Sequence, residues 1–233
     1  MNKVEIQKFF KQWHIYKSII KNNYMCHDEI FSSFYNFFTN VEDEDLTVVE
    51  IGCGDAYYPS KIFPKVNIIK YIGIDMSKYA LAEAKKNISN VNFSCEFICN
   101  DAMLELQNIN EKYNIIVAGY MLQHLNDDQL TELLRNVYLK LKNRYGYVFW
   151  YDMFRNNNLE LIEYRNIFHN EIYKNWNDLT MEERDITLDH TKNHDYIRSY
   201  EEVELYAKKA GFREVKKVYS SENGYYAAFI LCK

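Results

Sequence analysis

The sequence VVEIGCG at residues 48–54 is a short apolar run that ends in two closely spaced glycines. β-Branched apolar residues favour a buried strand, and the glycines that follow favour a sharp turn. Glycine also lets the backbone adopt positive φ and approach a ligand closely. Ligands of open parallel sheets bind where such strands end. This stretch therefore predicts a binding crevice at the end of a first strand.

Four more apolar runs follow along the chain, at residues 68–74, 91–98, 113–118 and 145–151. Helical periodicity separates them. Ser77 is placed to cap a helix through residues 80–88, and Asp127 to cap one through residues 130–141. Strands that alternate with helices imply right-handed crossovers, and hence a parallel sheet with helices on both faces.

Three segments fall outside this alternation. Residues 3–38 carry apolar residues at helical spacing, and residues 152–199 are helical, polar and irregular. After a last helix that stops at Gly211, strands at 215–219 and 225–231 follow each other with only a turn between them. Two such strands predict an antiparallel hairpin.

We therefore predict a three-layer α/β fold with a Rossmann-like, seven-stranded, mostly parallel sheet and an antiparallel terminal hairpin. A length of 233 residues suits one embellished domain better than two domains. Its expected parts are an N-terminal helical cap (1–40), a binding core (47–151), a helical insertion or lid (152–199), and a final helix with the hairpin (200–233). The acidic stretch at 42–45 reads as a solvated connector.

The composition argues against several classes of protein. Apolar residues make up 48% and charged residues 26%, unlike a disordered chain or a disulfide scaffold. No apolar run reaches the roughly 18 residues of a transmembrane helix, and the first eight residues lack the core of a signal peptide. The net charge of −5 argues against a nucleic-acid partner. Five cysteines without a CxxC pair indicate reduced thiols and a cytoplasmic location.

Acidic residues follow the second and third strands. Asp75 comes about 20 residues after the glycine turn, where a carboxylate can accept hydrogen bonds from ribose hydroxyls. Asp101 follows the third strand, where a carboxylate can accept from an adenine amino group, and Gly119 ends the fourth. The strand ends therefore converge on one crevice with residue types that suit an adenosine.

The ordered motifs EIGCGDA (50–56), IGIDMS (72–77), CNDAM (99–103) and YNIIVAGYMLQHL (113–125) resemble those of a class I S-adenosylmethionine-dependent methyltransferase. The resemblance covers roughly residues 47–151 together with the hairpin. It implies S-adenosyl-L-methionine as the cofactor, with S-adenosyl-L-homocysteine as its product.

The resemblance also implies roles for individual residues. Glu50 would lie near the methionine amino group, Asp75 would bind the ribose diol, and Asp101 would contact the adenine edge. The full implied cofactor set is Glu50, Gly52, Cys53, Gly54, Asp75, Met76, Asp101, Ala102, Met103, Gly119 and Tyr120. One departure is Ala56, which stands where the first motif usually has a third glycine.

The acceptor of the methyl group is expected to be a small molecule, methylated at O, N or C. Enzymes that methylate the amino groups of bases usually carry an Asn/Asp-Pro-Pro-Tyr-like motif after the fourth strand, whereas this chain has Gly119-Tyr120-Met121-Leu122. The candidates for a catalytic acid or base are Tyr16, His27, His124 and His190.

Alternatives stay open at this point. They are a nicotinamide dehydrogenase, a non-catalytic domain that binds an adenosyl cofactor or acts as a sensor, and a methyltransferase of a macromolecule. His190 and His194 are spaced to share a helix face and bind a metal ion, but no third ligand is apparent, so no metal site is expected. The acceptor, the general base and the oligomeric state are not specified by the sequence.

Overall fold

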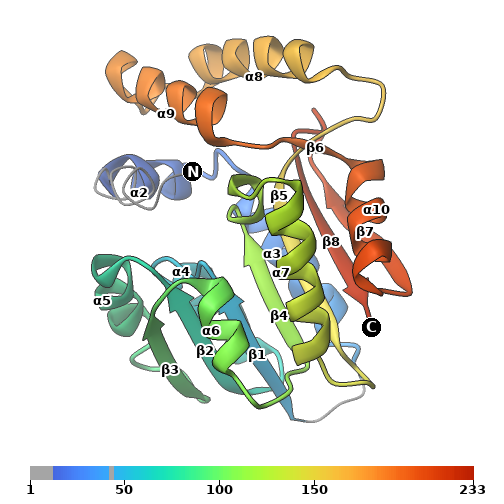
Figure 1. The fold of residues 1–233 in the computed structure, drawn as a ribbon. Helices are drawn as coiled ribbons and strands as arrows, with labels where there is room; N and C mark the ends of the chain where they lie inside the picture. The colour runs from blue at the N-terminus through green and yellow to red at the C-terminus, as the bar shows by residue number, and fades with distance from the viewer. Residues whose placement is uncertain (1–12, 42–44) are drawn as a thin grey trace.

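The computed structural model describes residues 13–41 and 45–233, as three stacked layers with a helical lid (Figure 1). The predicted helical residues 3–12 and the connector residues 42–44 lie outside the described residues.

Seven strands form the main sheet in the order β3-β2-β1-β4-β5-β8-β7. They are β1 (Leu46–Ile51), β2 (Ile68–Asp75), β3 (Ser94–Cys99), β4 (Ile115–Gly119), β5 (Tyr147–Arg155), β7 (Glu214–Ser220) and β8 (Tyr226–Cys232). Strands β1 to β5 are parallel to one another. Strand β8 runs antiparallel to both β5 and β7. This confirms the predicted sheet and its terminal hairpin.

The strand order reverses next to β1, which is where the glycine turn emerges. In the register, Glu50 of β1 lies opposite Gly73 of β2 and Val117 of β4. The carboxyl ends of these three strands are therefore level. A ligand can reach all of them at this switch point.

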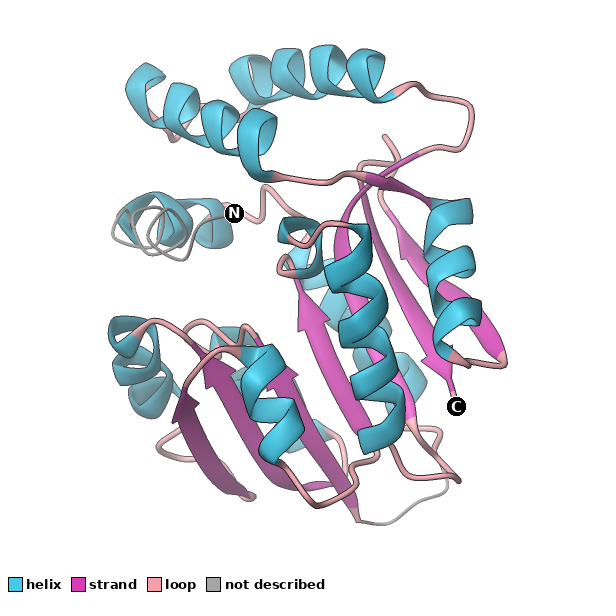
Figure 2. Ribbon diagram, in the orientation of Figure 1, coloured by secondary structure: helices cyan, strands magenta, loops and turns pink. Residues whose placement is uncertain are grey.

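Helices cover both faces of the sheet, as Figure 2 shows. Each face has its own apolar cluster, because the strands are buried on both sides. On one side pack α3 (His27–Phe38), α4 (Tyr57–Ile62), the short η1 (Phe63–Lys65) and α5 (Lys78–Asn87). On the other side pack α6 (Ala102–Asn108), η2 (Leu122–His124), α7 (Asp127–Lys140) and α10 (Tyr200–Ala210).

A third apolar cluster builds the lid beyond the carboxyl ends of the strands (Figure 1). Its helices are α2 (Trp13–Lys21), α8 (Leu161–Asn175) and α9 (Met181–His194). The lid cluster meets the sheet through Met153, Tyr225 and Tyr226. No helix among the described residues has the length and apolar character needed to cross a membrane.

The structure corrects two local predictions. Strand β5 continues to Arg155, which is four residues into the segment assigned to the insertion. Two strands extend it: β8 pairs with β5 as far as Tyr226, and the short strand β6 (Arg198–Ser199) pairs with the end of β5. The cap of α7 is Asn126 rather than Asp127, because Asn126 forms a capping box with Gln129.

The predicted caps of two other helices are confirmed. The Ser77 hydroxyl accepts a hydrogen bond from the backbone N–H of Ala80 at the start of α5. Gly211 ends α10 with φ of 108°, a backbone conformation that favours glycine.

Candidate active site

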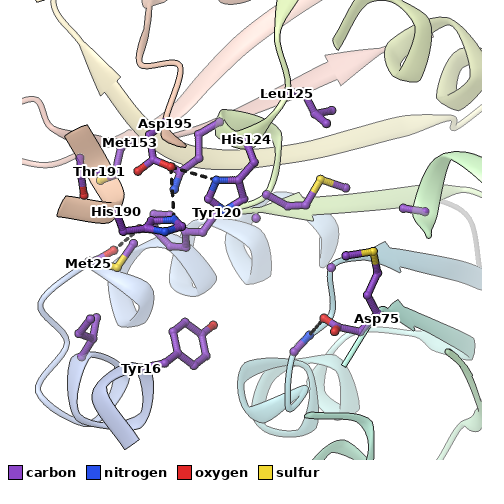
Figure 3. A pocket seen from close by; sticks show the side chains of 18 of the residues that line it. Tyr16, Met25, Asp75, Tyr120, His124, Leu125, Met153, His190, Thr191 and Asp195 are labelled. Carbon is purple, nitrogen blue, oxygen red and sulfur yellow. Dashed lines mark hydrogen bonds and ion pairs between the residues drawn. The ribbon is translucent and has the colours of Figure 1, made fainter. Parts of the chain in front are cut away.

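A cavity lies at the carboxyl ends of the strands, between the sheet and the lid (Figure 3). Its lower wall comes from the ends of β1, β2 and β4 and from the segments that follow β3 and β4. Its upper wall comes from α2, α8 and α9 and from the segments that follow them. The cavity therefore brings together chain segments that belong to two different parts of the molecule.

The predicted cofactor residues mostly share this cavity. Those that line it are Gly52, Gly54, Asp75, Met76, Asp101, Ala102, Met103, Gly119 and Tyr120. Glu50 and Cys53 do not line it.

Glu50 is buried among side chains on the α3 side of the sheet. Its Oε2 accepts a hydrogen bond of 2.5 Å from the Tyr71 hydroxyl, and 3% of the residue is exposed. Burial raises the pKa of Glu50 to about 8, against the effect of the Tyr71 hydrogen bond. Cys53 is also buried and packs toward Gly73 of β2. These two residues support the turn rather than face the cavity.

The glycine turn is held in a shape that few residues adopt. Gly52 and Gly54 have φ of 72° and 54°, and Ala56 has φ of 50°. A third glycine would adopt that last conformation more readily, but an alanine is small enough to occupy it.

Asp75 fixes this turn from the neighbouring strand. Its Oδ2 accepts a hydrogen bond from the Gly54 backbone N–H at 2.9 Å, and its Oδ1 accepts one from the Ser77 backbone N–H at 2.7 Å. Burial raises the pKa of Asp75, and these backbone donors oppose the shift. Each carboxylate oxygen can accept a second hydrogen bond, so Asp75 has capacity left for ribose hydroxyls. The residues present therefore fit an adenosyl group.

Asp101 has a structural role as well as a place on the cavity wall. Its Oδ1 accepts hydrogen bonds from the backbone N–H groups of Met103 and Leu104 at 3.0 and 3.2 Å, which caps α6. The cap holds Ala102 and Met103 at the rim. The neighbouring Asn100 also lines the cavity and was not predicted.

The segment after β4 is shaped by close packing. A Cβ at Gly119 would lie 1.8 Å from the Tyr151 ring, so only glycine fits there. Tyr120 has φ of 48°, and its hydroxyl donates to the Met25 carbonyl. Tyr120 therefore ties the cavity floor to the segment between α2 and α3.

Three of the four candidates for acid or base catalysis line the cavity: Tyr16, His124 and His190. His27 does not. It is 2% exposed and stacks on the Tyr58 ring at 5.2 Å between centroids, with Tyr120 at 4.9 Å. Burial lowers the pKa of His27 to about 3, so it is a neutral core residue.

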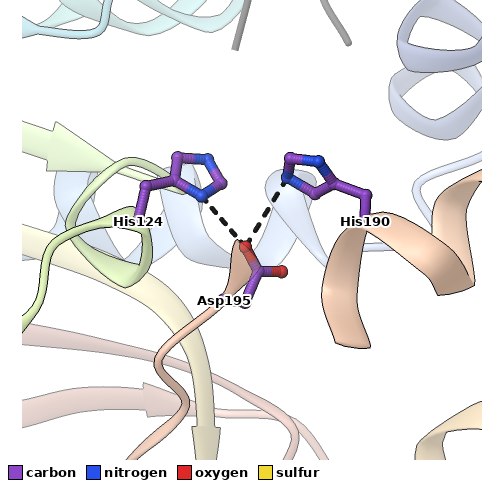
Figure 4. A group of neighbouring side chains, drawn as sticks. All are labelled: His124, His190 and Asp195. Carbon is purple, nitrogen blue, oxygen red and sulfur yellow. Dashed lines mark ion pairs between the residues drawn. The ribbon is translucent and has the colours of Figure 1, made fainter. Parts of the chain in front are cut away.

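His124 and His190 converge on a third side chain, Asp195, as Figure 4 shows. Nδ1 of His124 lies 2.9 Å from Oδ1 of Asp195, and Nε2 of His190 lies 3.6 Å from the same oxygen. Burial lowers the pKa of His190 to about 4, although the Asp195 carboxylate opposes the shift. The expectation that no third metal-ligating group lies near His190 is wrong, because two such groups lie beside it.

The cavity is also lined by residues outside the predicted cofactor and catalytic sets. Apolar side chains there are Ile19, Met25, Met153, Phe168 and Trp176, and polar ones are Gln123, Thr187 and Thr191. Among the described residues that line the cavity, none is lysine or arginine. The aromatic residues of the insertion were a partial signal, but their spacing does not show which of them turn inward.

Helix α2 contacts both parts of the molecule. Lys17 pairs with Glu83 of α5 at 3.1 Å, and His14 pairs with Glu183 of α9 at 3.2 Å. Just after α2, the Tyr24 ring stacks on Trp176 at 5.0 Å between centroids. The helix thus closes one side of the cavity.

Comparisons with known proteins agree with this geometry. Residues 48–144 match the family described as a methyltransferase domain. The chain is similar to the malonyl-[acyl-carrier protein] O-methyltransferase of Bacillus cereus, with 33% identity over 103 residues, which is 43% of this chain and 35% of that protein. The enzyme of the same name from Priestia megaterium is 29% identical over 149 residues, 61% of this chain and 49% of its own length. The chain thus spans half or less of the length of these relatives.

Solved structures share the fold at low identity. The S-adenosylmethionine-dependent methyltransferase SibL has a TM-score of 0.62 and 16% identity, over 87% of this chain and 54% of SibL. Phosphoethanolamine N-methyltransferase 2 of Haemonchus contortus, in complex with S-adenosyl-L-methionine, has a TM-score of 0.55 and 15% identity, over 82% of this chain and 38% of its own. These findings confirm the resemblance to class I methyltransferases and the fold that it implies.

Proposed function

We propose that the protein transfers a methyl group from S-adenosyl-L-methionine to a small molecule bound under the lid. The observation that supports this most directly is the shared cavity, which joins the glycine turn and Asp75 on one side to Phe168, Trp176 and His124 on the other. The cofactor and an acceptor could therefore lie in contact without crossing a protein wall.

The bound cofactor would supply an electrophilic methyl group on a sulfonium sulfur. Asp75 would accept hydrogen bonds from the ribose, and Met76 and Met103 would pack on the adenine. The glycine turn would let the backbone approach the methionine end. The lid helices would exclude water and orient the acceptor, and orientation of this kind can contribute roughly 7–11 kcal/mol in favourable cases.

Tyr16, His124 and His190 are the groups that could hold or accept a proton from the acceptor. All three line the cavity, and Oδ1 of Asp195 lies 2.9 and 3.6 Å from ring nitrogens of the two histidines. An acceptor nitrogen that is already neutral would need no base, whereas a hydroxyl would need one of these groups.

The cavity wall favours an uncharged or weakly polar acceptor. The described lining residues include apolar and aromatic side chains but no lysine or arginine. An anionic acceptor such as a nucleic acid would find no lysine or arginine side chain among the described residues of this wall. The family match, at residues 48–144, also leaves out all three lid helices, which would set acceptor specificity.

We also infer that core and lid act as one functional unit in the cytoplasm. The supporting observations are the cavity that they share and the five cysteines, which all carry free thiols.

Calorimetry with S-adenosyl-L-homocysteine tests the cofactor site. Asp75→Asn is expected to weaken binding by about 1–3 kcal/mol, as for a lost charged hydrogen bond. The matched control is Glu132→Gln, an exposed carboxylate on α7, which is expected to leave the affinity unchanged. Equal affinities in the Asp75 variant and the parent would remove Asp75 from the site.

Product formation then tests the reaction. Release of S-adenosyl-L-homocysteine on incubation with candidate small molecules supports the proposal. Tight cofactor binding without any turnover would favour a sensor, and binding of a nicotinamide cofactor instead would favour a dehydrogenase.

A further inference from the structure

The His124, His190 and Asp195 side chains form a compact group on the cavity wall (Figure 4). They come from two parts of the chain: His124 ends η2, whereas His190 lies in the last turns of α9 and Asp195 directly follows that helix. One ligand atom from each lies within 4.8 Å of the others. The group therefore depends on a long-range contact between η2 and the end of α9.

The spacing of their atoms suits a bound cation. A transition-metal ion holds imidazole nitrogens and carboxylate oxygens at about 2.0–2.2 Å, which puts neighbouring ligand atoms about 2.9–3.5 Å apart. The two nitrogen-to-oxygen distances, 2.9 and 3.6 Å, lie at or just beyond the limits of this range. All three atoms lie within 4.8 Å of one another, so the group would have to contract around a bound ion.

Hydrogen bonds explain this arrangement less well. Nδ1 of His124 lies 2.9 Å from Oδ1 of Asp195, but no hydrogen bond joins the two atoms. Neither carboxylate oxygen of Asp195 accepts a hydrogen bond within the described part of the chain, and its side chain is 1% exposed. Arg165 donates to the backbone carbonyl of Asp195 rather than to its carboxylate. A buried carboxylate in this position is costly unless a cation compensates its charge.

We propose that His124, His190 and Asp195 bind a divalent transition-metal ion, with Zn²⁺ as the representative probe. Two imidazoles and one carboxylate are a ligand set that such ions accept while keeping positions open. The open positions would face the cavity, where an oxygen or nitrogen of a bound small molecule could occupy one. The inference does not rest on the proposed methyl transfer, but a bound ion would occupy His124 and His190 and leave Tyr16 as the candidate proton acceptor.

The test is a Zn²⁺ titration of the chelator-treated full chain, in competition with a chromogenic chelator. One ion per chain is expected. His190→Gln and Asp195→Asn are each expected to raise the apparent dissociation constant at least about 10–100-fold, the loss that even outer-shell changes cause. Co²⁺ loading gives a second readout, because ligand-field absorption reports the coordination directly. Thermal unfolding of each variant establishes that it is folded.

His194→Gln is the matched control. This residue lies on the same helix, with its ring 5.4 Å from that of His190, but it is not part of the group. Its replacement is expected to leave the affinity for Zn²⁺ unchanged. An equal loss in His194→Gln and His190→Gln would overturn the proposed ligand set.

Two further outcomes would also overturn the proposal. One is no stoichiometric Zn²⁺ binding. The other is binding that survives His190→Gln, as expected if exposed thiols such as Cys95 and Cys99 hold the ion. Calorimetry with S-adenosyl-L-homocysteine on the same samples separates the two proposals, because the cofactor site can fail or succeed independently of the metal.

Discussion

The core and the lid face each other across one cavity, but different kinds of packing hold them. The core is a continuous sheet with an apolar cluster on each face. The lid is a smaller cluster of largely aromatic side chains between helices, and it reaches the sheet through only a few residues such as Met153 and Tyr226. Local opening requires less free energy where fewer buried contacts are lost. The comparison therefore predicts a rigid cofactor side and a more adaptable acceptor side.

Removal of a core aromatic ring should have the largest effect. Phe149 of β5 is fully buried and contacts Phe34 and Phe31 of α3. Phe149→Ala is expected to lower the free energy of unfolding by about 3–5 kcal/mol, the usual cost of a deleted buried phenylalanine. Urea denaturation measures the loss. A change below 1 kcal/mol would show that this part of the core is not closely packed.

The matched change in the lid should have a smaller effect on global unfolding. Phe168 of α8 is also buried, and it packs on Trp176, Tyr225 and Tyr226. Phe168→Ala is expected to increase hydrogen exchange in α8 and α9 and to leave binding of S-adenosyl-L-homocysteine nearly intact, because the lid can open while the sheet stays folded. If the variant lowered the free energy of global unfolding as much as Phe149→Ala does, core and lid would be one cooperative unit.

One contribution to the pH dependence of stability should come from the core side. Glu50 keeps its proton in the folded state up to a pKa of about 8, whereas its ordinary value is 4.5. Between these values the folded state binds one more proton than the unfolded state. This contribution to stability is therefore complete below pH 4.5 and falls as the pH rises, by about 1.4 kcal/mol for each pH unit.

Replacement of Glu50 tests this slope. Glu50→Gln is expected to flatten the fall in stability between about pH 5 and pH 8, as measured by denaturation at several pH values. Glu132→Gln on the exposed face of α7 should keep the slope of the parent. An unchanged slope in the Glu50 variant would mean that this carboxyl group is already ionised in the folded protein.

Helix caps give the smallest and most closely matched comparison. Ser77 caps α5 in the core, and Thr180 caps α9 in the lid, each through its side-chain oxygen. Ser77→Ala and Thr180→Ala are each expected to remove about 1 kcal/mol. The loss should appear in global unfolding for Ser77 and mainly in hydrogen exchange of α9 for Thr180. Identical behaviour of the two variants would contradict the distinction between core and lid.

The sequence predicted the core well because its signals are local. Glycines at the end of β1, Asp75 at the end of β2 and the terminal hairpin are each set by a few neighbouring residues. The same signals misplaced Glu50 and Cys53, because they locate a turn without showing which side of the sheet each side chain occupies.

The lid was predictable only as a helical segment. His27 was predicted as a candidate base, but aromatic rings enclose it. The contacts between these rings form only because α3 packs on the sheet. The approach of His124 to His190 depends on how α9 lies over η2, across 66 residues of chain. Periodicity carries no information about such long-range contacts.

Helix α2 has a consequence for how fast ligands exchange. It pairs with α5 through Lys17 and with α9 through His14. In each pair the α2 side chain is exposed to solvent, 46% for Lys17 and 70% for His14. Exposed pairs of this kind contribute about 0–1 kcal/mol each and are screened by salt. Residence times of molecules in the cavity should therefore shorten as ionic strength rises, even where the equilibrium occupancy changes little.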